Sequence, residues 1–174
     1  MLYVVGEVTG VTCVDSTMYV VCGDSSTILL YNTDTYSPLN VVINVDGMTD
    51  PRDIAVCRED RQLYVADCYY CIWRVSADDH SYVKWLPTQS TTDTFDVDSL
   101  SVTSRRVLVT SERPPGLRQY STTNRQLLHR VPLPRCVKEL WHAVETTRQT
   151  FVISHRGMSQ DEVSELFSFC QSKL

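Results

Sequence analysis

The chain has 174 residues, of which 43% are hydrophobic and 21% charged, and its formal net charge is −5. This composition is typical of a folded soluble protein and excludes a disordered chain of low hydrophobicity. The acidic balance disfavours a nucleic-acid partner, because affinity for nucleic acid depends on Lys and Arg side chains that neutralise phosphates.

The first residues lack the basic start and apolar stretch of a secretory signal, and no apolar run reaches the ~18 residues of a membrane-spanning helix. We therefore expect no membrane association. Seven cysteines, an odd number, favour reduced thiols inside the cell, and we expect a cytoplasmic protein. The C-terminal Ser172, Lys173 and Leu174 give the alternative of a peroxisomal address.

Short apolar strands recur along the whole chain and group into four blade-like repeats of one domain, residues 1–174. An isolated strand is expected at 2–5. The first repeat, roughly residues 8–51, has strands at 10–14, 18–22, 28–31 and 39–45. The second, 52–97, has strands at 53–57, 63–67, 72–75 and 83–86. The third, 98–139, has strands at 99–102, 107–111, 117–120 and 127–131. The fourth, 140–174, has strands at 142–144, 150–154 and 163–166.

The second strands of the four repeats begin about 45, 44 and 43 positions apart, which is the length of a propeller blade. The runs are rich in Val, Ile, Leu, Tyr and Thr and are bounded by clusters of turn-forming residues. Residues 160–172 also show apolar residues at helical spacing. The repeat register favours a strand there, so we predict an all-β fold.

The second repeat contains residues 50–56 (DPRDIAV), 63–67 (LYVAD) and 71–76 (CIWRVS). These segments provide a Pro before a first strand, a second strand ending in Asp and an apolar third strand, and in this pattern the repeat resembles the NHL repeat. Asp53 stands where the family has Gly, and Cys71 where it has Arg. The other three repeats match mainly in strand spacing and hydrophobicity.

The resemblance implies a β-propeller, in which closure of the ring protects strand edges. Four repeats leave two alternatives, a closed four-bladed ring and an incomplete or open ring. We favour the open ring, because NHL-like blades have a wedge shape suited to more than four blades. Exposed blade edges would then allow self-association.

Cys68 and Cys71 have the spacing of a redox pair or of half a zinc site. They lie in a turn between two strands, without the helix of a redox motif or a second pair of metal ligands, so we interpret them as turn cysteines. The sequence contains no Gly-x-Ser-x-Gly, Walker or HExxH motif. We therefore predict no catalytic residues, no cofactor and no metal.

The start of each first strand and the end of each second strand should emerge on one face of a propeller. That face offers a mixture of charged, aromatic and imidazole side chains, which suits an interface. The predicted binding residues are Arg52, Asp53, Asp98, Glu112, Trp141, His142, His155 and Arg156. We predict a non-catalytic scaffold that binds a protein or peptide. The alternative is a metal-assisted, lactonase-like propeller hydrolase or lyase, whose ligands would come from equivalent positions of several blades.

Overall fold

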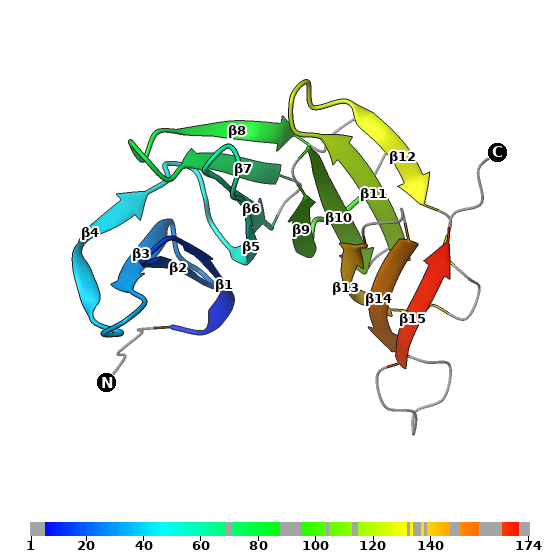
Figure 1. Cartoon of the computed structure of the whole chain (residues 1–174), viewed down its shortest axis with the longest axis horizontal. Coiled ribbons are helices and arrows are strands. Elements are labelled where there is room, and N and C mark those ends of the chain that lie inside the picture. Colours follow the sequence, from blue (N-terminus) through cyan, green and yellow to red (C-terminus); the bar gives the residue numbers. More distant parts are fainter. Residues whose placement is uncertain are drawn as a thin grey trace. The chain divides into compact units, whose positions relative to one another are not determined.

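The structure is a computed structural model, which describes residues 6–68, 71–87, 95–103, 105–112, 115–131, 133, 137, 139–146, 150–156 and 165–170. In this part of the chain all regular structure is β-strand, and the strands form four antiparallel sheets (Figure 1). No helix of the described residues is long and apolar enough to cross a membrane. The expected strand at 2–5 and the tripeptide Ser172 to Leu174 lie outside the described residues.

The chain divides into two compact units, residues 1–87 and 88–174. Two four-stranded sheets make up the first unit. Sheet 1 has the order β1 (Val8–Val14), β2 (Thr17–Cys22), β3 (Thr27–Asn32) and β4 (Pro38–Asn44). Sheet 2 has the order β5 (Pro51–Cys57), β6 (Gln62–Asp67), β7 (Cys71–Ser76) and β8 (Tyr82–Pro87).

The second unit contains sheets 3 and 4. Sheet 3 is formed by β9 (Ser99–Thr103), β10 (Arg106–Glu112), β11 (Pro115–Ser121) and β12 (Leu127–Val131), and sheet 4 by β13 (Glu139–Glu145), β14 (Thr150–Arg156) and β15 (Glu165–Cys170). The all-β prediction is confirmed. Within the described residues the predicted strands fall on observed ones, and the last, predicted at 163–166, overlaps β15 at Glu165 and Leu166. The prediction of one domain over 1–174 stays a prediction.

Three of the turns repeat one geometry. In the turns that follow β3, β7 and β11, the side-chain oxygen of the first residue accepts hydrogen bonds from the backbone N–H groups two and three positions later; these first residues are Asn32, Ser76 and Ser121. The fifth residue of each turn has a positive φ: Tyr36, His80 and Arg125. Asn and Ser form such turns readily, and their spacing repeats the period of the strands.

Sheets 1 and 2 share one hydrophobic core. The strands β2 and β6 are nearly continuous apolar runs, and alternate residues of each face this core. From sheet 1 it takes Tyr19 and Val21, and from sheet 2 Leu63, Val65 and Trp73. Each of these residues is at most 7% exposed. In the second unit a separate core joins Leu108 and Leu117 of sheet 3 to Leu140, Phe151 and Ile153 of sheet 4.

The strands β1 and β5 approach each other closely at Gly10. A Cβ atom added to Gly10 would lie 2.7 Å from the backbone N of Ile54 and 3.0 Å from the Cα of Asp53. Beside this contact, the Thr9 hydroxyl donates a hydrogen bond of 2.6 Å to the Pro51 carbonyl. The absence of a side chain at Gly10 therefore allows the two sheets to meet at this end.

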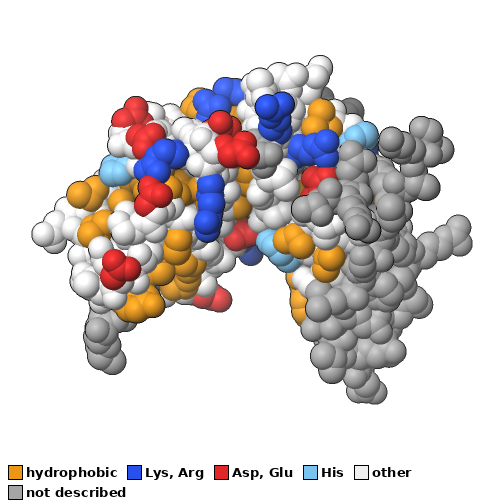
Figure 2. All heavy atoms as spheres, in the orientation of Figure 1, with side chains coloured by type: hydrophobic (Ala, Val, Ile, Leu, Met, Phe, Trp, Pro, Cys, Tyr) orange, Lys and Arg blue, Asp and Glu red, His pale blue; other side chains and the backbone are white. Residues whose placement is uncertain are grey.

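On the face of the molecule that Figure 2 draws, acidic and basic side chains lie interspersed among the described residues.

We predict that Gly10→Ala lowers the free energy of unfolding by about 1–3 kcal/mol. The new methyl group would clash with backbone atoms of Asp53 and Ile54, which cannot shift without moving strand β5. Gly23→Ala is the matched control, since its Cβ would lie 3.6 Å from the nearest atoms, an ordinary contact. Urea unfolding followed by tryptophan fluorescence measures both variants. Equal stability of the two would contradict the close approach of β1 and β5.

Candidate functional site

A cleft opens in the first unit where β1 begins, β2 ends and β5 begins. Its volume is about 590 Å³. One wall comes from sheet 1 and its loops, and the other from the segment that leads into β5. The lining residues are Gly6, Glu7, Thr9, Gly23, Asp24, Ser25, Asp50 and Arg52. This is the end of the sheets at which the sequence predicted a binding face.

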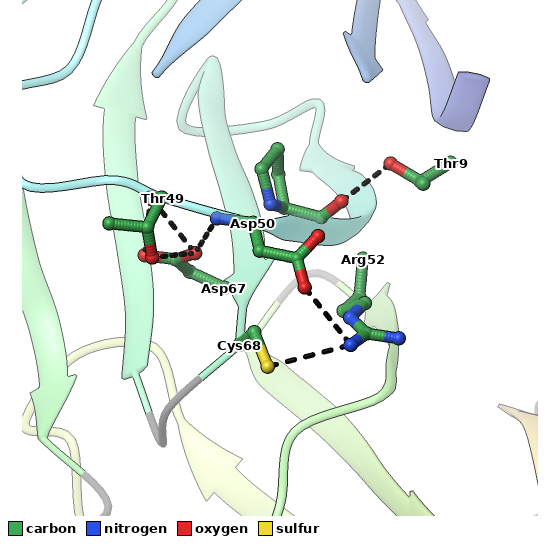
Figure 3. A network of polar contacts seen from close by, with 7 residues as sticks. Thr9, Thr49, Asp50, Arg52, Asp67 and Cys68 are labelled. Carbon is green, nitrogen blue, oxygen red and sulfur yellow. Dashed lines mark hydrogen bonds and ion pairs between the residues drawn. The ribbon is translucent and has the colours of Figure 1, made fainter. Parts of the chain in front are cut away.

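The buried carboxylate of Asp67 fixes the second wall. Asp67 is 2% exposed, and it accepts hydrogen bonds from the backbone N–H of Asp50 at 2.8 Å and of Thr49 at 3.2 Å. The Trp73 indole N–H donates to its other oxygen at 3.0 Å. Figure 3 shows this carboxylate against the backbone of Thr49 and Asp50. Since a buried carboxylate is costly unless several donors surround it, this arrangement determines the path of the chain into β5.

An aspartate at the end of a strand often accepts hydrogen bonds from the backbone of the turn that follows it. Asp67 instead accepts hydrogen bonds from Asp50 and Thr49, which lie 17 and 18 positions earlier in the chain. The reason is strand alternation. Asp67 has the same parity as Leu63 and Val65, so its side chain lies on the core-facing side of β6.

Arg52 is held in place at the rim of the cleft. Its Nη2 lies 3.0 Å from the Asp50 carboxylate and 3.5 Å from the Cys68 sulfur (Figure 3). The hydrogen bond with Cys68, and after it the charge of Asp50, raise the pKa of Arg52, so its guanidinium is always charged. Arg52 is thus paired with Asp50, a carboxylate of the same wall.

The wall from sheet 1 carries two more carboxylates, Glu7 and Asp24. The backbone N–H of Gly23 donates to the Glu7 carbonyl at 2.9 Å, which brings these two segments together. Both Glu7 and Asp24 are exposed. Neither was predicted from the sequence, because both lie just outside strands; the signal available was their position beside the start of β1 and the end of β2.

The predicted residues of the first unit have different roles. Arg52 lines the cleft. Asp53 is half-buried beside Gly10, and its carboxylate accepts a hydrogen bond of 2.8 Å from the backbone N–H of Ile54. It does not line the cleft.

In the second unit the structure brings Asp98 and Glu112 together, since the Asp98 carboxylate accepts a hydrogen bond of 2.7 Å from the Glu112 backbone N–H. His142 is half-buried, and its Nδ1 contacts the Ser99 hydroxyl. Trp141 is 46% exposed.

The remaining two predicted residues are His155 and Arg156, and neither has a side chain that the structure describes as exposed. His155 is 0% exposed. It has the same parity as Phe151 and Ile153 of β14, which face the core, and this alternation was the signal that could have placed it. Arg156 pairs with Glu139 in the strand register, and its side chain is outside the described residues.

Of the cysteine pair, Cys68 follows the end of β6 and Cys71 is the first residue of β7. Cys71 is buried and its thiol points to the Asp67 carboxylate at 3.7 Å, whereas Cys68 is half-buried beside Arg52. Burial, and then the charge of Asp67, raise the pKa of Cys71 to about 12. Within the described residues, no three His, Cys, Asp or Glu side chains gather closely enough to hold a metal ion.

We predict that Asp67→Ala lowers the free energy of unfolding by about 3 kcal/mol or more, because it leaves buried donors without an acceptor. Glu59→Ala, which removes an exposed carboxylate, should change it by less than about 0.5 kcal/mol. Urea unfolding of both variants tests this. A loss in Asp67→Ala no larger than in the control would show that the carboxylate does not hold the wall.

We also predict unequal labelling of the two cysteines by iodoacetamide at pH 8. With a pKa of about 12, only about one Cys71 in 10⁴ is a thiolate. The partly accessible Cys68 should therefore be alkylated first, and Cys71 only after unfolding. Peptide mass spectrometry at successive times measures both sites. Equal rates in the folded protein would contradict the burial of Cys71.

Comparison with known proteins supports a propeller-type fold. No protein-family model matches the chain, and no curated protein sequence matches it. Among solved structures, hydrazine synthase of Kuenenia stuttgartiensis superposes with a TM-score of 0.74 at 10% identity, covering 94% of this chain and 46% of the other. The WD40 β-propeller domain of Doa1 gives 0.65 at 18% identity, covering 93% and 51%.

A chain in a nidogen/laminin complex gives a TM-score of 0.67 at 15% identity, covering 86% of this chain and 57% of the other. The present chain thus spans about half the length of the structures it matches. At these identities the likeness concerns the fold. Together with the four antiparallel sheets, it shows that this chain is an all-β protein with a β-propeller-like array of four blades.

Proposed function

We propose that this chain is a non-catalytic propeller scaffold with NHL-type blades that binds a protein or peptide partner through the cleft of its first unit. The observation that carries the proposal is the cleft itself. It is concave, it lies where strand ends and loops meet, and its second wall is fixed by the hydrogen bonds of Asp67. A preformed site of this kind loses little conformational entropy when a ligand binds.

The size and chemistry of the cleft support a peptide ligand. A volume of about 590 Å³ lies within the range of about 300–1,000 Å³ typical of ligand sites. Its lining is mostly polar or charged, and two glycines, Gly6 and Gly23, leave backbone accessible. One of the structures with this fold is part of a nidogen/laminin complex, so the fold is compatible with a protein partner.

The predicted residues of the second unit add a separate surface to this proposal. Trp141 is exposed, and tryptophan is enriched among residues that dominate binding energies. Together with Asp98, Glu112 and the half-buried His142, it provides aromatic and charged groups that suit a protein interface.

Selection from a phage-displayed library of random dodecapeptides tests the proposal. We expect enriched peptides to bind the full chain and to bind Gly23→Phe at least tenfold more weakly. The Gly23 Cβ direction lies between Thr9 and Asp50, so a phenyl ring there fills the cleft. Asp34→Phe, in the exposed turn after β3, is the control and should bind like the wild type.

Two results would contradict the proposal. One is a selection that enriches no peptide for the folded chain. The other is a set of peptides that bind Gly23→Phe as tightly as the wild type, while both proteins unfold at similar temperatures.

A further inference from the structure

We propose that the cleft of the first unit selects a lysine or arginine side chain of its partner, so that the partner is a basic peptide segment. This inference rests on the proposed peptide-binding function and makes it more specific. It follows from how charge is divided between the two walls of the cleft.

The wall from sheet 1 is anionic and uncompensated. Within the described part of the chain, the carboxylates of Glu7 and Asp24 make no side-chain hydrogen bond or ion pair. Both residues line the cleft, and both are exposed. Their charges are therefore available to a ligand.

The wall from sheet 2 is already neutralised. Arg52, the cation of the cleft lining, is 3.0 Å from the Asp50 carboxylate and also contacts the Cys68 sulfur. Asp50 is fixed in turn, because its backbone N–H donates to Asp67. Asp50 already balances the charge of Arg52. An anionic ligand would also be repelled by Glu7 and Asp24, whereas a cationic ligand is attracted by these two carboxylates.

The uncharged lining residues add acceptors for an ammonium or guanidinium group. The Thr9 hydroxyl donates its proton to the Pro51 carbonyl, so its oxygen can still accept a hydrogen bond. Ser25 belongs to the same wall from sheet 1, and its hydroxyl shares a hydrogen bond of 2.8 Å with Thr27. Gly6 and Gly23 have no side chains that would block the approach of a long cationic chain.

The overall charge acts in the same direction. A net charge of −5 attracts basic peptides at long range. Because Glu7 and Asp24 are exposed, their contribution is weakened by salt. Binding should therefore be weak for a short peptide and should decrease as ionic strength rises.

The test is an NMR titration of the full chain with acetyl-Gly-Ser-Arg-Ser-Gly-amide, with its Lys, Gln and Glu counterparts as comparison peptides. We expect the Arg and Lys peptides to shift the amide signals of residues 6–9, 23–25 and 50–52, and the Gln and Glu peptides to leave them unchanged. The double variant Glu7→Gln/Asp24→Asn should bind the Arg peptide about tenfold more weakly. Asn is well tolerated at position 24, where φ is positive.

The matched control is Asp34→Asn/Glu59→Gln, which removes the same number of charges from exposed positions outside the cleft. It should bind the Arg peptide like the wild type. Equal loss in both double variants would show attraction by net charge alone and would overturn the inference. Binding of the Gln or Glu peptide in the cleft as tightly as the Arg peptide, or no shift with the Arg peptide, would also overturn it.

The two proposals can fail separately. If library-selected peptides bind in the cleft but contain no Lys or Arg that contributes to affinity, peptide binding stands and the selection of a cationic side chain is wrong. If no peptide binds the cleft at all, both are wrong.

Discussion

The carboxylate of Asp67 is the interaction on which the candidate site depends. It lies on the core-facing side of β6, where a charge is costly unless it is surrounded by donors. The donors come from the segment before β5 and from the Trp73 indole of the neighbouring strand. The hydrogen bonds that the buried Asp67 carboxylate needs therefore also determine the shape of the cleft at the surface.

The close approach of β1 and β5 forms the other constraint. Gly10 allows the backbones to meet, and Thr9 connects the sheets by its hydrogen bond to Pro51. Beside this contact, residues at the start of β1, after β2 and at the start of β5 line the cleft. The segment that carries Asp50 and Arg52 is held by Thr9 of sheet 1 on one side and by Asp67 of sheet 2 on the other. The positions of Asp50 and Arg52 therefore depend on how the two sheets pack. The cleft is thus a consequence of how two blades meet, and its charge pattern is a property of the loop residues.

Much of the fold could be predicted from the sequence, because buried strands leave a local signal. The runs at residues 18–22 and 63–66 are continuously apolar, and the spacing between them can be read without knowledge of distant contacts. The role of Asp67 could not be predicted in this way, since its donors lie 17 and 18 positions away and meet it only through the loop before β5. Arg52 was predicted from its position at the start of a strand. Glu7 and Asp24 lie just before β1 and just after β2, and the hydrogen bond from the Gly23 N–H to the Glu7 carbonyl shows that these two segments lie side by side.

Amide hydrogen exchange at Asp50 is the most direct test of the central claim that a buried carboxylate holds the wall of the cleft. The account predicts that the Asp50 amide, which donates to Asp67 at 2.8 Å, is protected as strongly as the amides of β6. The exposed amides of Asp46 and Gly47 in the same loop should exchange rapidly. Exchange of the Asp50 amide as fast as theirs would contradict the account.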